Sequence, residues 1–284
     1  MAMTINQVHE TKIGWKIFSY IVMVFFAVFT LAPLIWLFYT SFKPHRDIIK
    51  NVFAFPTSFF VGNYVSVWTR AQMGILLLNS IFYSVGATVI TVFFALAAGF
   101  GFAKFGYKIS KVFYSFFIMG LLIVLNAVII PLFIMERTLR IDDTYIGVFL
   151  PYIAFGLPFN VYLATSFIKS IPDSMVEAAF MDGCSYLKIF VYIIIQLATP
   201  VVATMIIFGF INNWNELILM LTLTSRSAIR SLPVGIFAFA GTGMSRDYGK
   251  QMAASVIGIV PILIFYIAFH KQLEKGFAAG ALKE

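Results

Sequence analysis

Residues 171–200 read IPDSMVEAAFMDGCSYLKIFVYIIIQLATP and lie between long apolar segments of the chain. The stretch nevertheless carries four charged side chains, which are Asp173, Glu177, Asp182 and Lys188. A charged side chain at the centre of a bilayer costs about 2.5–3.5 kcal/mol, so a membrane span does not hold four of them this close together. We therefore expect the stretch to lie outside the hydrocarbon layer.

The same stretch has the pattern of ordered structure rather than of a linker. Pro172 ends the preceding helix, and Ser174 with Glu177 matches the S-x-x-E capping box of a helix start. Gly183 stands where a left-handed turn would end that helix, and Ser185 is placed to cap a second one. The pattern predicts a short helix, a glycine turn and a second helix at a membrane surface.

Composition places the whole chain in the membrane. Hydrophobic residues make up 61% of the sequence and charged residues 11%, and the mean hydropathy is +0.94. Soluble domains contain about 25% charged residues, so the chain is predicted to be a polytopic all-α membrane protein. Although the net charge is +8, the basic residues are spread through the loops between apolar segments. That distribution indicates membrane-flanking charge and not a nucleic-acid-binding surface.

Six segments approach or exceed the roughly 20 apolar residues that a spanning helix needs. They cover residues 15–40, 75–103, 112–135, 146–168, 201–222 and 252–270. We expect them to form a single transmembrane domain over residues 1–284, with the loop 171–200 between the fourth and fifth spans. The spacing of Ala95, Gly99 and Ala103 predicts close helix packing in the second span. Pro131 allows a kink in the third, although a proline tolerated in a packed bundle is the more common case.

The number of basic residues on each side does not decide the orientation of the chain in the membrane. With the N-terminus inside, ten of the 20 Lys and Arg residues fall on each side of the membrane. The short loop 104–111 holds three lysines and no acidic residue, and the positive-inside rule is strongest for short loops. Placing this loop inside puts both termini and the stretch 171–200 in the cytoplasm.

A polar cluster in the fifth span allows two interpretations. It consists of Asn212, Asn213, Trp214, Asn215 and Glu216. Such residues are costly at membrane depth unless they face protein or water. They line a path for a hydroxyl-rich solute, with Trp214 offering an apolar face, or they mark a structural break at the outer end of the span. Asn126 in the third span is a further candidate for the path, although a lone asparagine more often cross-links helices.

The sequence argues against chemistry within this chain. Gly101 and Gly106 have the glycine spacing of a phosphate-binding P-loop, but Tyr107 stands where its lysine is required. The three histidines are far apart, and no H-E-x-x-H or G-x-S-x-G motif is present. We therefore expect no catalytic residue, no metal site and no cofactor bound by the chain itself.

A family resemblance gives the stretch a role. The pattern E-A-A-x-x-D-G-x(6)-F-x-x-I-x(6)-P, from Glu177 to Pro200, resembles the EAA loop of ABC-importer permeases. Other matches point to the carbohydrate-uptake group of type I importers, which includes the maltose transporter. They are Pro33, Trp36, Ser41, Lys43, Asn63, Tyr64, Trp68, Asn79, Ser80, Trp214, Asn215, Glu216, Pro233, Val234 and Gly235. The chain resembles the second, smaller permease of that transporter.

The resemblance implies a transporter that is built from several proteins with different roles. Two homologous permeases would form the path as a heterodimer in a prokaryotic plasma membrane. A cytoplasmic ATPase dimer would bind ATP and Mg²⁺, and an external solute-binding protein would deliver the sugar. The ATPase would grip the coupling helix through Glu177, Ala178, Ala179, Asp182 and Gly183. From the residues alone, Glu177 caps its own helix, contacts the partner, or does both.

The chain departs from the family pattern at two positions. Gln196 stands where the family commonly has proline, and glutamine allows the second helix of the stretch to run on, which leaves the geometry at the start of the fifth span open. Cys184 replaces a common alanine, which is a small apolar exchange. Two other functions remain open, namely import of a solute that is not a sugar and secondary transport. The latter needs an intramembrane ion site, for which only Glu216 is available.

Overall fold

The computed structural model describes residues 13–70, 72–241 and 247–281, and every regular element in these ranges is a helix. The predicted cytoplasmic ends at residues 1–12 and 282–284 lie outside them. Four helices are long and apolar enough to cross a bilayer. They are α1 (Ile13–Thr40), α4 (Met73–Lys104), α7 (Tyr145–Lys169) and α14 (Tyr248–Ala281). Two bent pairs complete six segments when each pair counts as one span, which confirms the predicted all-α membrane fold.

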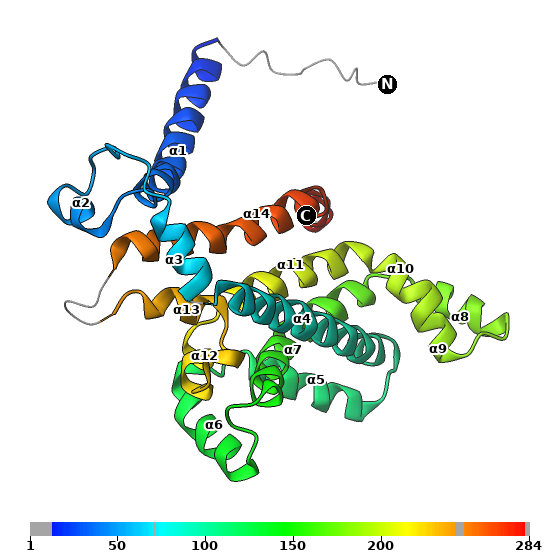
Figure 1. Cartoon of the computed structure of the whole chain (residues 1–284). Coiled ribbons are helices and arrows are strands. Elements are labelled where there is room, and N and C mark those ends of the chain that lie inside the picture. The colour runs from blue at the N-terminus through cyan, green and yellow to red at the C-terminus, as the bar shows by residue number, and fades with distance from the viewer. Residues whose placement is uncertain (1–12, 71, 242–246, 282–284) are drawn as a thin grey trace.

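The 32-residue helix α4 separates two groups of shorter elements. Figure 1 shows α3 (Gly62–Arg70) and α13 (Leu232–Ala238) near its start, and α8 (Asp173–Met181) and α9 (Tyr186–Ile189) beyond its far end. A helix of 32 residues is about 48 Å long, which exceeds the roughly 30 Å of a hydrocarbon core. The two groups therefore lie on opposite sides of the membrane.

Close packing of α4 on α7 forms the centre of the bundle. A Cβ atom on Gly99 would lie 2.7 Å from Ala164 Cβ and 3.0 Å from the backbone nitrogen of Thr165. Ala95 is fully buried on the same ridge. The small-residue spacing in α4 thus lets two backbones approach, as predicted. Buried residues of α4, α7 and the segment after α9, including Ile194, form the core next to this contact.

The first helix stands apart from the bundle. In Figure 1, α1 projects away from the other long helices, and its apolar 18-residue window contains no buried residue. Its end is tied to the next loop through Lys43, whose side chain is 2% exposed and donates to Asn51 O at 2.7 Å and Ala54 O at 2.8 Å. Asn63 in α3 donates in turn to the backbone oxygen of Lys43 at 2.9 Å. The loop containing α2 (His45–Lys50) is thereby fixed at the end of α1.

The third predicted span is not one straight helix. It consists of α5 (Lys108–Gly120) and α6 (Leu125–Leu139), which meet at 103°. The bend falls at residues 121–124, whereas Pro131 lies inside α6, so the main change of direction does not occur at the proline. A Cβ on Gly120 would lie 2.8 Å from Pro158 Cγ, so the end of α5 is packed tightly against α7.

The helix after α9 continues through Gln196, as that residue allows, and bends two residues later. A π-helical turn (Phe190–Ile194) and α10 (Ile195–Leu197) lead to a break, and α11 (Thr199–Asn215) leaves at 78°. Pro200 has no N–H to donate to the oxygen of Gln196, four residues earlier. The hydroxyl of Thr199 donates to that oxygen instead, at 2.7 Å. Pro200, at the start of α11, therefore contributes to the bend.

The predicted fifth span also ends earlier than its apolar run. Residues 201–222 divide between α11, which ends at Asn215, and a separate short helix, α12 (Ile218–Leu223). A 3₁₀ turn, η2 (Ser227–Ile229), connects α12 to α13. The polar cluster 212–216 thus lies at a helix break, as one of the two interpretations requires.

Candidate functional site

The charged stretch forms two short helices at the end of α4, although its start differs from the prediction. The first helix, α8, begins at Asp173 directly after Pro172, and no side chain caps it. Ser174 therefore lies inside the helix instead of at its N-cap, and the predicted capping box with Glu177 is not formed. The extended backbone of Pro172 (φ −58°, ψ 136°) sets the earlier start.

The glycine turn after α8 is confirmed. Gly183 has a φ of +79°, a left-handed conformation in which a Cβ atom is strained. Its N–H donates to Phe180 O at 3.0 Å, and the N–H of Cys184 donates to Ala179 O at 3.0 Å. This pair of bonds is a Schellman motif. The Ser185 hydroxyl then accepts from Lys188 N at 3.4 Å, as predicted for the cap of α9.

Most of the predicted coupling residues share an exposed surface. Glu177, Ala178, Asp182 and Gly183 are exposed, whereas Ala179 is 8% exposed and packs with the core around Ile189. Met181 on the same helix is 87% exposed. An exposed carboxylate beside small and apolar side chains is suited to contact another protein. This surface lies outside the membrane-spanning bundle.

A buried lysine ties this surface to α4. Lys104 ends α4, and its side chain is 4% exposed. Its Nζ donates to Ile171 O and to Asp173 Oδ1, each at 2.5 Å. The two bonds connect the end of α4 to the turn between α7 and α8. α8 is therefore linked to α4 through a single side chain.

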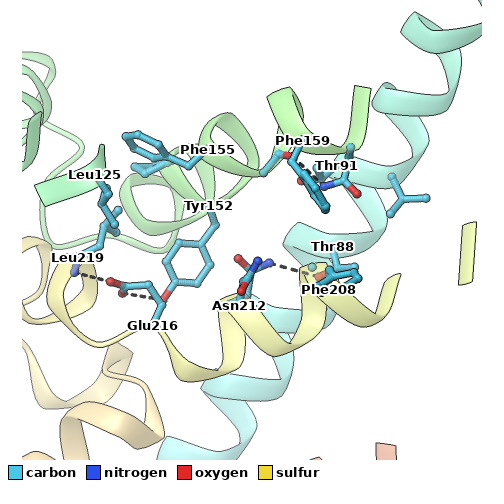
Figure 2. Close-up of a pocket in the computed structure, with 16 residues that line it drawn as sticks. Thr88, Thr91, Leu125, Tyr152, Phe155, Phe159, Phe208, Asn212, Glu216 and Leu219 are labelled. Atoms are coloured by element: carbon cyan, nitrogen blue, oxygen red, sulfur yellow. Dashed lines mark hydrogen bonds between the residues drawn. The ribbon is translucent and has the colours of Figure 1, made fainter. Parts of the chain in front are cut away.

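A cavity of about 220 Å³ lies between α4, α7 and α11. Figure 2 shows its side chains, with Asn212 between Tyr152 and Phe208. The lining combines aromatic rings with a small number of polar groups, as ligand sites commonly do. It comprises Thr88, Thr91, Val92, Leu125, Pro151, Tyr152, Phe155, Gly156, Phe159, Asn160, Phe208, Gly209, Asn212, Asn213, Glu216 and Leu219.

Several polar atoms in the cavity lack a partner within the described part of the chain. Asn160 Nδ2 donates to Gly156 O at 2.7 Å, but its Oδ1 is buried without a hydrogen bond. The hydroxyl of Thr91 is likewise buried without a hydrogen bond. Asn213 Nδ2 donates to Thr88 Oγ1 at 3.2 Å, while the Asn212 amide makes no bond to any described residue. Buried unpaired polar groups are costly, so the unpaired oxygens of Asn160 and Thr91 favour a hydrogen-bonding solute, and the exposed Asn212 amide adds a further polar group.

Glu216 joins the cavity to the helix break. Its carboxylate accepts from the backbone nitrogens of Leu219 and Met220 at 2.7 and 3.0 Å, and so caps α12. The Tyr152 hydroxyl also donates to it, at 3.3 Å, from across the cavity (Figure 2). The polar cluster is therefore a structural break and a cavity wall at the same time. Its role as a solute path remains a prediction.

The other candidates from the sequence lie elsewhere. Trp214 is 2% exposed and stacks on Phe210 with centroids 5.5 Å apart. Asn215 is exposed and bonds back to Ile211 O of its own helix at 2.8 Å. Asn126 is exposed near the start of α6. None of the three lines the cavity.

Sequence reasoning missed the threonines and most of the aromatic residues of the cavity. Thr88 and Thr91 are three residues apart on α4, a spacing that places both on one helix face. That spacing was the available signal. The phenylalanines of the cavity gave no such signal, because the chain contains 33 phenylalanines and they are distributed along its length.

Residues 91–278 match the family described as the inner membrane component of binding-protein-dependent transport systems. The chain belongs to this family. It is 31% identical to the trehalose transport system permease protein SugB of Mycobacterium tuberculosis, over 90% of this chain and 93% of that protein. It is 28% identical to the diacetylchitobiose uptake system permease protein NgcG of Streptomyces coelicolor, over 93% and 88% of the two chains.

The fold is also similar to that of a solved structure. The permease matches a chain of a bacterial ABC transporter involved in importing the acidic polysaccharide alginate, with a TM-score of 0.79. The match covers 90% of this chain and 95% of the other, at 24% identity. The protein is thus a multi-pass inner-membrane permease of an ABC importer, and a family of this description works with a solute-binding protein and an ATPase.

Proposed function

We propose that this permease imports sugars or oligosaccharides and forms half of their path together with a second, homologous permease. An external binding protein delivers the solute, and a cytoplasmic ATPase dimer, which binds ATP and Mg²⁺, drives the cycle. The names of the trehalose and diacetylchitobiose relatives support a carbohydrate substrate. The proposal extends to the orientation, with both termini and α8 in the cytoplasm.

The observation that carries the substrate class is the combination of groups in the cavity. Unpaired polar atoms of Thr91, Asn160 and Asn212 lie among aromatic rings. Such a lining offers hydrogen bonds to hydroxyl groups and apolar faces to the C–H groups of a sugar ring. The volume of about 220 Å³ is below the roughly 300 Å³ at which ligand pockets begin, which favours a path completed by a partner subunit.

The exposed α1 supports the same assembly. A helix that is apolar on all sides and unburied in its own chain needs lipid or another protein around it. In a heterodimer, part of this surface would pack on the second permease and the rest would face the bilayer. Recovery of a core of two permeases and two ATPase subunits from mild detergent would support this arrangement. Recovery of a monomer, with all partners co-expressed, would count against it.

The mechanism we propose is alternating access driven from outside the chain. ATP binding closes the ATPase dimer and moves α8, which it holds through the surface around Glu177. The Lys104 bonds pass this movement to α4, whose Thr88 and Thr91 line the cavity. The nucleotide thereby biases an equilibrium between inward- and outward-facing arrangements.

A single substitution tests the coupling. Gly183→Leu forces a Cβ into a φ of +79°, which costs about 1–2 kcal/mol and distorts the turn after α8. We expect the variant to reach the membrane at normal levels but to lose most ATP-dependent sugar uptake. The matched control is Gly106→Leu, since Gly106 lies on the same side, has open space around it and lacks a positive φ.

The measurement is uptake of labelled trehalose and other sugars into proteoliposomes that contain the assembled transporter. Normal uptake by Gly183→Leu would falsify the coupling assignment. Uptake that needs no ATP and follows a proton or sodium gradient would identify a secondary transporter. ATP-dependent uptake that a large excess of sugars does not reduce would indicate a solute of another class.

A further inference from the structure

A second cavity, of about 410 Å³, lies at the end of α4 that is opposite to α8. Its walls are the first turn of α4 with Gln72, the loop residues Ser227 and Arg230, and one face of α13 with Gly235. None of these residues belongs to the cavity between α4, α7 and α11. In the proposed orientation the second cavity faces the outside of the cell.

The backbone around this outer cavity is held in place by side chains of α4. Asn79 Nδ2 donates to Ala228 O at 2.7 Å and to Arg230 O at 3.0 Å. The hydroxyl of Ser80 accepts from Leu232 N at 2.7 Å. These buried polar bonds fix the loop before α13 against a long transmembrane helix. The outer cavity is therefore a preformed feature of the fold.

Helix α13 completes the cavity by packing closely on α4. A Cβ atom on Gly235 would lie 2.2 Å from Leu76 Cδ1, so a larger residue there would displace the Leu76 side chain. Val234 beside it is 2% exposed. The position of α13 is thus as firmly determined as that of the loop.

Arg230 is the charged group of the outer cavity, and its charge is not balanced. Its Nε is buried without a hydrogen bond, and one terminal nitrogen makes a contact of 3.5 Å with Thr224 O. No carboxylate among the described residues forms an ion pair with it. The neighbouring Arg226, by contrast, pairs with Asp143 at 3.0 Å. A partly buried guanidinium with unmet donors favours an incoming anion.

We propose that the outer cavity receives an acidic side chain of the solute-binding protein, which pairs with Arg230. The inference rests on the proposed function, because it needs the partner and the orientation given above. A guanidinium is planar and matches a carboxylate with two parallel hydrogen bonds. Ser227 and Gln72 supply further polar groups at the rim, and the apolar residues of α13 provide contact area.

The charge of the surrounding segments is consistent with an acidic partner surface. Residues 41–74 and 223–251 together contain eight Lys and Arg residues and two Asp residues. An excess of one sign around a docking site accelerates encounter with a surface of the opposite sign and aligns it. Among the described residues of this set, Arg230 combines a place in the preformed cavity with an unpaired, partly buried charge.

The test measures binding of the solute-binding protein to the assembled transporter in nanodiscs. A fluorescently labelled binding protein is titrated onto complexes that carry wild-type permease, Arg230→Gln, Arg230→Lys or Arg46→Gln. Arg46 serves as the matched control because its side chain is 83% exposed, it belongs to the same basic segments, and it does not line the cavity. Each titration is done with and without bound sugar on the binding protein, and basal ATP hydrolysis is recorded.

We expect Arg230→Gln to raise the Kd of the binding protein at least about tenfold in both sugar states. Arg230→Lys should recover part of the loss, Arg46→Gln should change the Kd less than about twofold, and basal ATP hydrolysis should stay unchanged. An unchanged Kd in Arg230→Gln overturns the inference. Weakening confined to the sugar-loaded protein also overturns it, since the carboxylate would then belong to the cargo. If the wild-type complex does not bind or respond to the binding protein, the proposed function itself fails.

Discussion

At the scale of single residues, Lys104 makes two hydrogen bonds that contribute unequally to stability. In the ion pair with Asp173, the Asp173 side chain is 76% exposed to solvent. The ion pair therefore contributes little to stability. The bond to Ile171 O lies beside a residue that is 7% exposed, and its loss leaves a backbone oxygen unpaired. The backbone bond therefore holds the turn before α8.

This inequality gives a prediction. Lys104→Met should keep the permease in the complex but reduce sugar uptake per ATP hydrolysed severalfold, whereas Asp173→Asn should have little effect. Lys108→Met removes an exposed lysine at the start of the next helix and serves as the control. Both uptake and ATP hydrolysis are measured in proteoliposomes. Equal losses in Lys104→Met and Asp173→Asn would contradict the role given to the Ile171 bond.

A second prediction concerns Asp143, in the loop between α6 and α7. Partial burial opposes its ionisation, but bonds from the backbone N–H groups of Arg226 and Ser225, and from the Arg226 side chain, outweigh this effect. The pKa of Asp143 is consequently lower than usual. Its stabilising contribution is present above the unfolded-state pKa of about 4 and is lost as the pH falls through the lower pKa of the folded state.

The difference in melting temperature between wild type and Asp143→Asn should therefore be constant from about pH 7 to pH 5 and should close at lower pH. Thermal unfolding of the detergent-solubilised permease at a series of pH values measures it. Asp142→Asn is the control, because no ion pair of Asp142 is found among the described residues. A gap that persists unchanged to about pH 3 would show that the charge of Asp143 does not stabilise the loop.

At the scale of elements, two glycines of α4 should respond with opposite sign to the same substitution. Glycine to alanine inside a helix is favourable by about 1 kcal/mol when the space is open. The space at Gly101 is open, since the nearest atom to an added Cβ is Phe105 Cδ2 at 3.8 Å. At Gly99 the added atom meets Ala164 at 2.7 Å, and overpacking of this kind costs about 1–3 kcal/mol.

We accordingly expect Gly99→Ala to lower the melting temperature of the permease, and Gly101→Ala to leave it unchanged or to raise it slightly. The experiment is thermal unfolding of both variants in the same detergent. Equal shifts would mean that α4 and α7 are free to move apart at this contact. The result bears on function, because the same two helices form walls of the cavity.

Elements were predictable from the sequence where a local rule decides them. The apolar segments, the glycine turn at Gly183 and the cap at Ser185 each depend on nearby residues. The bends between helices could not be predicted from hydropathy. Hydropathy is averaged over a window of residues and does not register a change in the direction of a helix. The helix continues through Gln196, and Pro200 lacks the N–H that would bond to the Gln196 oxygen and extend it further. The capping box is absent because Pro172 moves the helix start two residues earlier.

At the scale of the whole molecule, the two candidate sites differ in how they are encoded. The coupling surface is contiguous in sequence, so its residues could be named before the fold was known. The cavity is assembled from residues 88–92, 151–160 and 208–219, which meet through the packing of three helices. Successive residues of a helix differ by about 100° in direction. Asn212, Asn213 and Glu216 therefore face the cavity, while Trp214 and Asn215 face away.

This division provides the last prediction, for two asparagines on α11. The Asn212 amide lines the cavity without a bond to any described residue, whereas the Asn215 amide bonds within its own helix and lies outside the cavity. If sugar passes through the cavity, Asn212→Leu removes a free hydrogen-bonding group from its path. We expect this change to raise the half-saturating concentration of sugar-loaded binding protein or to lower maximal uptake several-fold, with assembly and basal ATP hydrolysis preserved.

Asn215→Leu makes the same chemical change one turn away, and we expect uptake close to that of wild type. Uptake assays on both variants in proteoliposomes distinguish the two interpretations of the polar cluster. Normal uptake by Asn212→Leu would leave the cluster with a purely structural role, in which Glu216 caps α12 and the solute crosses elsewhere.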